Sequence, residues 1–483
     1  MISTEELYSL YVSCGYRVTT DSRAVRGGEI FFALKGENFD GNAYAVKALA
    51  NGAALAVVND GSECLAVSAG LPAGKLIKVE DPFTELQKLA VYHRERLGIP
   101  VIGLTGTNGK TTTKELMAAV LRSRFRVTAT EGNLNNDIGV PLSLLRMTPE
   151  TQIAVIEMGA SHPDDIAKLV VVSRPDYGLI TNVGKAHLLG FGSFEGVKAA
   201  KGELYKWLGR RDGGVIFLNQ DDSDLVEMAR REPCHVWGYG LKYQGAELLP
   251  ATAGDPFLGL RLQDGTEVHT RLVGAYNATN VLAALAVGEY FGVPREDAIA
   301  AVGAFVPSNQ RSQMQRTASN TLIIDAYNAN PSSMGVALDN LFGMDAPSRV
   351  ALLGDMRELG ADSLSEHVAL VKRLAASGVR FCLVGEEFRK AVLECIADGT
   401  LSGIETGTAA PLPSGLNNPM NVRVEAGETI PLNDGIPDSS PYMGWFPASS
   451  DLALHLGVHP LQGCVVLVKG SRGIRMEKVL PAL

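Results

Sequence analysis

The chain lacks the features that mark several classes of protein. Its six cysteines lie far apart in 483 residues and form no CxxC pair, so the sequence suggests neither a zinc site nor a redox couple. No apolar run is long enough to span a bilayer, and the acidic start MISTEELYSL differs from a basic secretory signal. We therefore expect reduced thiols, no membrane span and a cytoplasmic location.

Basic residues do not dominate either. The sequence contains 44 Lys and Arg and 53 Asp and Glu, which gives a net charge of -9. Such a chain has no overall positive field to hold a nucleic acid. Aromatic residues make up only 6%, but 46% of residues are hydrophobic and 20% are charged, which excludes disordered, collagen-like and coiled-coil proteins. At about 150 residues per domain, the length predicts roughly three domains.

The order of apolar and polar segments divides the chain into three parts. Residues 1–98 mix short β-like runs with Gly-rich turns and end in a helix-like segment closed by Gly98 and Pro100. In residues 99–314 apolar strands alternate with helices, and a second series of this kind occupies residues 315–483. Such alternation is typical of parallel sheets covered by helices, so we predict an α/β fold.

The apolar segments expected as strands are VIGLTG, QIAVIEMG, YGLITNVG and GVIFLNQ in the second part, and TLIIDAYN, RVALLGDM, RFCLVGEE and CVVLVKGS in the third. Residues 400–450 are rich in Pro, Gly, Ser and Asn, and we predict an inserted surface loop there. Ligands collect at the carboxyl edge of parallel sheets, so polar residues that follow the strands should form one site. They are Gly106 to Thr111, Glu157, Asn182 to His187, Asp325, Asp355 and Lys469 to Ser471.

The segment TGTNGKTTTK follows an expected strand and opens an expected helix. Its glycines let successive N–H groups face a phosphate, Lys110 adds a cation, and the Thr111 hydroxyl can bind Mg2+. The segment departs from the general phosphate-loop pattern at Leu104, where a glycine is usual. A glycine turn with a solvated lysine is the alternative, but the flanking strand and helix favour an ATP site. Its expected residues are Gly106, Thr107, Asn108, Gly109, Lys110, Thr111 and Thr112.

A triphosphate carries more charge than one lysine can offset, so Mg2+ and its ligands are expected as well. Glu157 and His187 follow strands that should share the edge of the phosphate loop. Either residue alone would more often be structural or solvated. Their shared position makes them the candidate metal ligands.

Taken together, these motifs resemble the ATP-dependent Mur ligases of peptidoglycan synthesis. The segments that carry the resemblance are TGTNGKTTTK, those around Glu157 and His187, GSFEGVKAAKGELY, GAYNATNVLAAL, Asp325 and VLVKGSRGIRMEKV. The short glycine loop is that family's version. Within the family, GNLNNDIGVPLSLL, DAYNANPSSM and GDMRELG are similar to the members that add D-Ala-D-Ala to UDP-MurNAc-tripeptide. The Asp-Asn-Pro-Arg signature of the diaminopimelate-adding members is absent.

The resemblance implies a UDP-sugar domain (1–98), a central ATPase domain (99–314) and a C-terminal Rossmann-like domain (315–483) that closes over ATP. It also implies a bacterial enzyme that forms an amide bond through an acyl phosphate, and we expect it to be a monomer. The peptide carboxylate would attack the γ-phosphate, and the D-Ala-D-Ala amine would then displace phosphate. No residue in the sequence is evident as the base that deprotonates the amine.

The resemblance further assigns residues one by one. Lys110, Glu157, His187 and Lys201 would be catalytic, and Thr111, Glu157, His187 and a carbamylated Lys201 would hold metal. Adenine contacts would come from Asn277 and Asn280, and ribose or phosphate contacts from Arg311 and Asp325. Substrate contacts would come from Ser22, Arg23, Lys35, Asn133, Asn135, Asn136, Asn328 and Asn330. The sequence alone predicts that Lys201 is a solvated helix lysine and that the Asn and Ser residues occupy turns.

Three other functions fit parts of this pattern. A ligase that adds diaminopimelate or lysine, or one that adds glutamate to folate, shares the ATP site and differs in the acceptor pocket. A phosphate-loop switch or motor would hydrolyse ATP without a peptide. A non-catalytic scaffold would tolerate the loss of Lys110.

Overall fold

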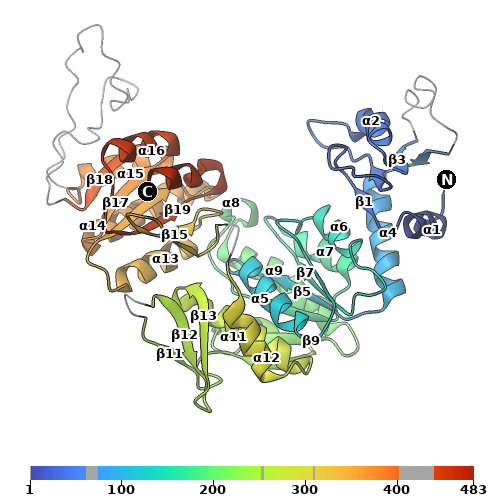
Figure 1. The fold of residues 1–483 in the computed structure, drawn as a ribbon, viewed down its shortest axis with the longest axis horizontal. Coiled ribbons are helices and arrows are strands. Elements are labelled where there is room, and N and C mark those ends of the chain that lie inside the picture. The colour runs from blue at the N-terminus through green and yellow to red at the C-terminus, as the bar shows by residue number, and fades with distance from the viewer. Residues whose placement is uncertain (1, 61–73, 252–254, 308–309, 402–439) are drawn as a thin grey trace, which may run out of the picture. The chain divides into compact units, whose positions relative to one another are not determined.

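The computed structural model describes residues 2–60, 74–251, 255–307, 310–401 and 440–483 (Figure 1). By their contacts the residues form two compact units. The first comprises 1–183, 198–243 and 281–301, and the second comprises 184–197, 244–280 and 302–483. No helix in the described ranges is long and apolar enough to cross a membrane.

The N-terminal domain is built on a four-stranded parallel sheet in the order β1-β2-β3-β4. The helix predicted before Gly98 is present as α4. The carboxylate of Asp81 caps this helix by accepting from the N–H groups of Phe83 and Thr84, and Gly98 ends it in the left-handed conformation at φ 60°. The elements are α1 (Thr4–Ser13), β1 (Val18–Thr19), β2 (Ile30–Phe32), α2 (Ala45–Ala50), β3 (Leu55–Asn59), β4 (Leu76–Val79) and α4 (Pro82–Leu97).

Helix α4 also joins this domain to the next. The guanidinium of Arg94, whose side chain is 8% exposed, pairs with Asp176 at 2.6 Å. The other carboxylate oxygen of Asp176 accepts from Arg211 at 2.7 Å, and the N–H of Val101 donates to the same carboxylate. Asp176 therefore connects α4, Val101 at the start of the central domain, and Arg211 just after the helix Phe194–Gly209.

Replacing Asp176 with alanine should destabilise the protein by about 3 kcal/mol, because it leaves a buried guanidinium without its counterion. Urea denaturation followed by circular dichroism would measure the change. Glu267→Ala is the matched control: the Arg261–Glu267 pair is exposed on both sides, and its loss should cost less than about 1 kcal/mol. Equal effects of the two substitutions would contradict the structural importance given to Asp176.

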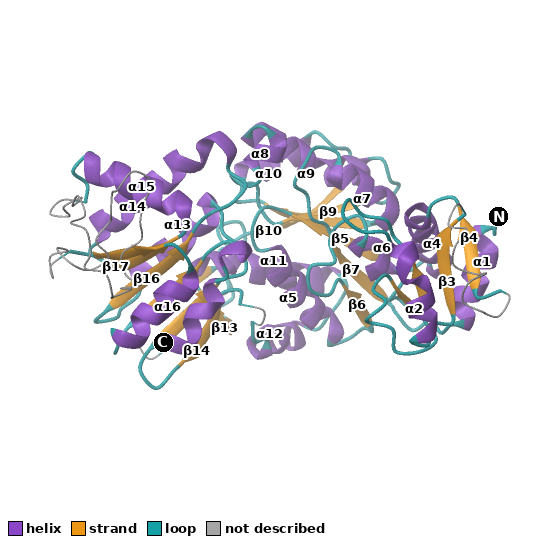
Figure 2. Cartoon of the chain, turned by 90° about the horizontal axis from the view of Figure 1, so that it is seen from above, coloured by secondary structure: helices purple, strands orange, loops and turns teal. Residues whose placement is uncertain are grey.

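The central domain holds a six-stranded parallel sheet in the order β10-β9-β8-β5-β7-β6, with helices on both faces (Figure 2). Its four predicted strands are all present, and β5, β7 and β9 are buried along their whole length. Leu104 pairs with Glu157 and Thr105 with Ile180, so β5, β7 and β8 end together. The strands are β5 (Val101–Thr105), β6 (Val127–Ala129), β7 (Ile153–Glu157), β8 (Tyr177–Ile180), β9 (Val215–Asn219) and β10 (His235–Tyr239).

Helices follow the strands of this sheet along the chain. They are α5 (Lys110–Arg122), α6 (Gly139–Leu144), α7 (Asp165–Ser173), α8 (Leu188–Phe191), α9 (Phe194–Gly209) and α10 (Ser223–Arg230). A three-stranded antiparallel sheet, β11 (Glu247–Leu249), β12 (Phe257–Arg261) and β13 (Glu267–Val273), comes next. This antiparallel sheet was not predicted from the sequence. In β13, however, exposed and buried residues alternate, as in a strand that has one face in the core and one face in solvent. Helices α11 (Ala278–Tyr290) and α12 (Arg295–Ala304) follow along the chain.

The C-terminal domain holds a second six-stranded sheet, in the order β14-β15-β19-β16-β17-β18, in which only β14 is antiparallel to its neighbour. All four predicted strands are present. The loop predicted for 400–450 is wrong at its C-terminal end, because β18 (Tyr442–Phe446) pairs in parallel with β17 and is mostly buried. Residues 402–439 of that prediction lie outside the described residues. The other elements are β14 (Gln313–Arg316), β15 (Thr321–Asp325), α13 (Pro331–Gly343), β16 (Arg349–Gly354), α14 (Ser363–Ser377), β17 (Arg380–Val384), α15 (Glu386–Ala397), α16 (Ser449–Val458) and β19 (Val465–Lys469).

Candidate active site

The predicted phosphate loop connects β5 to α5, and the end of β8 supports it. Gly106 has φ 146°, and a Cβ there would overlap the hydroxyl of Thr181, so a side chain is excluded by both conformation and space. The hydroxyl of Thr181 donates to the carbonyl of Asn108 at 2.6 Å. The side-chain oxygen of Asn182 accepts from the N–H of Asn108 at 3.0 Å. The residues after β8 therefore hold the curled backbone of the loop.

Thr181 and Asn182 were not assigned individual roles from sequence. The signal that points to them is local: both are polar and directly follow an apolar strand that pairs with β5. At the carboxyl end of neighbouring parallel strands, such residues face the adjoining loop.

Lys110 begins helix α5 at the end of the loop. Its ammonium donates to the carbonyls of Gly106 at 2.7 Å and Thr107 at 3.1 Å, which holds the cation over the loop. The N-cap residue Gly109, in the left-handed conformation at φ 77°, has no side chain that could cap the first turn. A helix N-terminus with an adjacent lysine is a site for anions such as phosphate. Thr112 lies half-buried in the same first turn.

Glu157 ends β7 beside this loop and is 1% exposed. The hydroxyl of Thr111 donates to its carboxylate, with oxygen–oxygen distances of 3.1 and 3.3 Å. The amide of Asn135 donates to the same carboxylate at 2.9 Å. Thr111 and Glu157 thus present a hydroxyl and a buried carboxylate together, the hard oxygen donors that Mg2+ prefers.

The described residues contain no group of three or more His, Cys, Asp and Glu arranged to hold a metal. Mg2+ commonly binds through one or two protein groups, with waters and substrate phosphates as its other ligands. The Thr111 and Glu157 pair therefore fits Mg2+ bound together with a nucleotide, and does not form a complete metal cage made by protein alone.

Lys201 lies on α9 and is 2% exposed, so the prediction of a solvated lysine is wrong. Burial and, to a smaller extent, the positive charge of Lys110 lower the pKa of its ammonium from 10.5 to about 7, although Asp165 opposes the shift. The influence of Lys110 places the two amines within electrostatic reach. At neutral pH much of Lys201 is therefore an uncharged amine, the form that reacts with CO2 to give a carbamate.

His187 belongs by its contacts to the second unit, whereas Lys110, Thr111, Glu157 and Lys201 belong to the first. Its Nδ1 lies against the carboxylate of Glu358, in the loop after β16. Lys185 pairs with Glu366 at 2.9 Å in the same region. The single site predicted from sequence is thus divided between two units, and the joint binding of metal by His187 and Glu157 stays a prediction.

The residues predicted to contact adenine and ribose all lie in the second unit. Asn277 and Asn280 are buried, and the amide of Asn280 donates to the side-chain oxygen of Asn277 at 2.9 Å. Asp325, at the end of β15, forms an ion pair with Lys469, which is 1% exposed at the end of β19. The guanidinium of Arg311 lies over the ring of Tyr327, 3.7 Å from its centroid.

The residues predicted to bind the UDP-sugar lie on turns of the N-terminal domain. Arg23 pairs with Asp21 at 2.8 Å on an exposed turn, and this hydrogen-bonded guanidinium lowers the pKa of the Asp21 carboxyl. The carbonyl of Ser22 accepts from the amide of Asn51 at 2.9 Å. Lys35 forms a backbone bridge with Asp40.

Several predicted substrate asparagines have structural partners. Asn133 is exposed, Asn135 faces Glu157, and Asn136 accepts from the N–H of Gly139 at 2.8 Å. Near the C-terminal sheet, Asn328 is exposed, while Asn330 caps α13 by accepting from the N–H of Ser333 at 2.8 Å. Asn133, Asn136 and Asn328 are the exposed members of this set.

Three family models match successive parts of the chain. The Mur ligase family catalytic domain matches residues 16–94, the Mur ligase middle domain residues 104–288, and the Mur ligase glutamate ligase domain residues 310–413.

The sequences of several named proteins align with a large part of this chain. The UDP-N-acetylmuramoyl-tripeptide--D-alanyl-D-alanine ligase of Bacillus subtilis is 37% identical over 347 residues, which cover 71% of this chain and 74% of that protein. The enzyme of that name from Escherichia coli is 36% identical over 381 residues, covering 77% and 81%.

Solved structures agree in fold along nearly the whole chain. MurF from Acinetobacter baumannii is similar with a TM-score of 0.74 at 28% identity, covering 96% of this chain and 92% of that one. MurF ligase from Thermotoga maritima in complex with ADP is similar with a TM-score of 0.73 at 26% identity, covering 96% of both chains. The domain order, the phosphate loop and these relatives together show that the chain belongs to the Mur ligase family.

Proposed function

We propose that the protein is an ATP-dependent ligase that joins D-Ala-D-Ala to UDP-MurNAc-tripeptide in the cytoplasm, with Mg2+. In this proposal residues 1–98 bind the UDP-sugar, 99–314 bind ATP, and 315–483 complete the site. The observation that carries the proposal is the arrangement of Lys110, Thr111, Glu157 and Lys201 beside one phosphate loop. The relatives named above carry this activity in their names.

Amide formation from a carboxylate and an ammonium is unfavourable in water, so the reaction must be coupled to ATP. The tripeptide carboxylate attacks the γ-phosphorus, the bond from that phosphorus to the β–γ bridging oxygen breaks, and ADP leaves. The dipeptide amine then attacks the acyl phosphate carbonyl, and inorganic phosphate leaves with the former acyl oxygen. The amine gives up a proton during this second step.

The chain's own groups act mainly by positioning and by electrostatics. The N–H groups of residues 106–111 surround the phosphates, and Lys110 offsets charge on the transferred phosphoryl group. Thr111 and Glu157 would hold Mg2+, which supplies further positive charge at the phosphate oxygens when bound. A carbamate on Lys201 would add an anionic group within electrostatic reach of Lys110.

A phosphate-release assay tests the proposal. With ATP, UDP-MurNAc-tripeptide and D-Ala-D-Ala all present, we expect one phosphate for each pentapeptide formed, and release should fall to background when any one is omitted. A nucleotide switch or motor would instead release phosphate without peptides. A panel with diaminopimelate, lysine and glutamate as acceptors tests the other ligases, and turnover with one of these in place of D-Ala-D-Ala would refute the proposed acceptor.

A further inference from the structure

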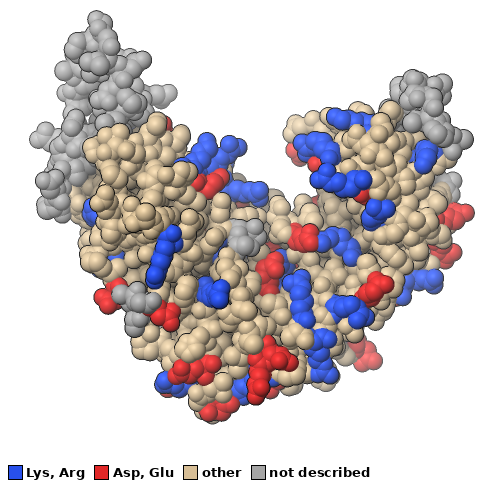
Figure 3. Space-filling view, in the orientation of Figure 1, with Lys and Arg blue, Asp and Glu red and all other residues tan. Residues whose placement is uncertain are grey.

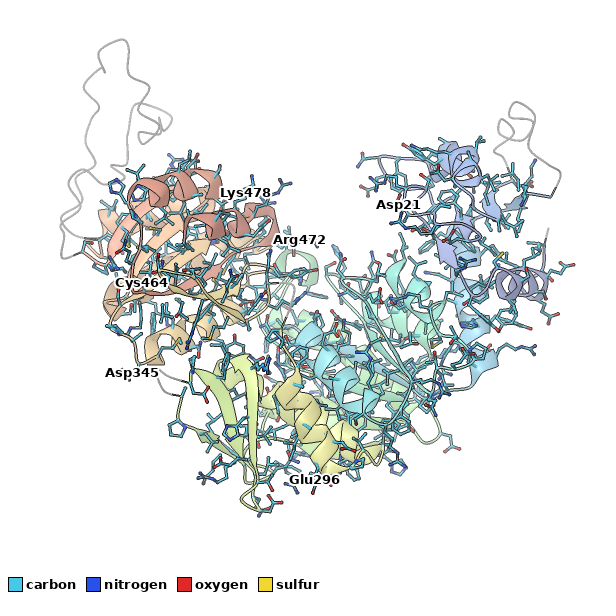
Figure 4. The ribbon with its side chains drawn as sticks, in the orientation of Figure 1. Asp21, Glu296, Asp345, Cys464, Arg472 and Lys478 are labelled. Carbon is cyan, nitrogen blue, oxygen red and sulfur yellow. The ribbon has the colours of Figure 1, made fainter. Side chains whose placement is uncertain are left out.

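Helix α5 begins at the phosphate loop and carries a buried lysine in its second turn. Many Lys and Arg side chains lie on the surface that Figure 3 shows, but Lys114 is 0% exposed. Buried side chains of α5 lie between this helix and the central sheet, where the helix contacts β6 and β7 (Figure 4). Burying an ammonium is unfavourable unless hydrogen bonds and opposite charges replace the lost water. The partners of Lys114 therefore indicate what this charge does.

The ammonium of Lys114 holds the chain at the point where β6 ends. It donates to the carbonyl of Thr130, the residue after β6, and pairs with the carboxylate of Glu115 at 2.8 Å. The N–H of Thr130 donates to the carbonyl of Val155 in β7 at 3.0 Å. Thr130 is 1% exposed, so its carbonyl needs a partner within the protein. Lys114 supplies that partner.

The pairing between β6 and β7 changes at Thr130. In a regular parallel pair, the N–H two residues after Val155, which is that of Glu157, would donate to the carbonyl of Thr130. This N–H donates instead to the hydroxyl of Thr130, at 3.0 Å. The side chain of Thr130 thus replaces its own carbonyl as the acceptor, and the carbonyl is bonded by Lys114. The hydroxyl of Thr130 and the ammonium of Lys114 are therefore two parts of one arrangement.

Residues 130–135, the 130–135 loop, return the chain to the end of β7. At the start of this loop, Thr130 accepts from the backbone N–H of Glu157. At its end, the amide of Asn135 donates to the carboxylate of Glu157 at 2.9 Å, and the carbonyl of Asn135 accepts from the N–H of Gly159 at 2.7 Å. The loop therefore fixes Glu157 twice, once through its backbone and once through its carboxylate.

We propose that Lys114 is a positioning residue for Glu157, because it holds the 130–135 loop in the shape that fixes this carboxylate. This inference rests on the proposed function, in which Glu157 and Thr111 hold Mg2+ beside the nucleotide. Thr111 and Lys114 lie in the first two turns of α5, so the helix that follows the phosphate loop also determines where the carboxylate lies. Groups that orient metal ligands commonly change metal affinity or activity by about ten- to hundredfold.

The first test measures ADP binding by calorimetry, in Mg2+ and in EDTA, and needs no peptide substrate. In the unaltered enzyme Mg2+ should strengthen ADP binding, and in Lys114→Met this strengthening should be about tenfold smaller. Affinity in EDTA should stay within about twofold, because Lys110 and the N–H groups of the phosphate loop are unchanged. In the phosphate-release assay, the Mg2+ concentration for half-maximal activity should rise by about tenfold, with most of kcat recovered at saturating Mg2+.

The second test uses a pair of variants at Thr130, which leave Lys114 in place. Thr130→Val removes the hydroxyl that accepts from the N–H of Glu157 and keeps the carbonyl, and it should reduce the effect of Mg2+ on ADP binding by about tenfold. Thr130→Ser keeps the hydroxyl and should retain this effect within about threefold. Lys206→Met is the control for Lys114→Met, because Lys206 is exposed on α9, and it should change neither affinity.

The results distinguish this inference from other roles of Lys114. An undiminished effect of Mg2+ in Lys114→Met would overturn the inference, as would an equal loss of ADP affinity with and without Mg2+, which would assign Lys114 to the phosphate loop alone. Equal losses in Thr130→Ser and Thr130→Val would also overturn it. Phosphate release that does not depend on D-Ala-D-Ala would overturn the proposed ligase activity, and would leave the comparison of ADP binding standing.

Discussion

Replacing Lys110 with alanine should lower kcat for peptide-dependent phosphate release by about a thousandfold, as expected for the loss of a cation that stabilises a transferring phosphoryl group. The ammonium lies over the phosphate loop through the carbonyls of Gly106 and Thr107. Steady-state assays at saturating ATP would measure the change. Calorimetric titration with ADP would separate weaker nucleotide binding from slower chemistry.

Arg122→Ala is the matched control for this experiment. Arg122 is an exposed cation at the far end of the same helix, α5, and its loss should leave kcat within about twofold of the unaltered enzyme. If Lys110→Ala retained more than about a tenth of the activity, the loop would not be the site of phosphoryl transfer. The alternative of a non-catalytic scaffold would then be favoured.

Replacing Lys201 with methionine should abolish activity and at the same time stabilise the protein at neutral and acidic pH. The folded protein holds this lysine at a pKa of about 7, against 10.5 for an exposed lysine, because of burial and the nearby Lys110. Below pH 7 the folded state therefore carries a buried ammonium. Methionine fills a similar volume without the charge.

The pH dependence follows from proton counting. Between pH 7 and pH 10.5 the unfolded lysine keeps a proton that the folded one has lost, so the stability of the unaltered protein should rise with pH in this window. The stabilisation by Lys201→Met should therefore be largest below pH 7 and should shrink as pH rises. Urea denaturation at several pH values in CO2-free buffer would measure it.

Lys206→Met is the control, because Lys206 is exposed on the same helix, α9. It should change neither the activity nor the pH dependence of stability. With 13C-labelled bicarbonate, the NMR spectra of the unaltered enzyme and of the Lys206→Met variant should show the carbon signal of a lysine carbamate. The spectrum of the Lys201→Met variant should lack this signal. A stability difference that did not vary with pH would refute the lowered pKa.

Much of the fold could be predicted because buried parallel strands have a simple signature. Eight apolar segments bounded by glycine or polar residues became β5, β7, β8, β9, β15, β16, β17 and β19. The phosphate loop was equally recognisable, since its glycines, Lys110 and Thr111 are adjacent in sequence. Strands β11 to β13, which carry exposed residues, were missed. The buried strand β18 was also missed, because it directly follows a segment rich in Pro, Gly, Ser and Asn.

The sequence by itself determined the chemistry that depends on neighbouring residues: the phosphate loop, the strand ends and the helix caps. Only the tertiary structure decided which distant side chains meet. It buried Lys201, directed Asn135 to Glu157, brought His187 against Glu358, and placed Arg311 and Arg472 over the ring of Tyr327. The physical reason is that burial and ionic pairing arise from packing between elements far apart in the chain, whereas hydrogen bonding within a turn or a helix terminus depends on a few consecutive residues.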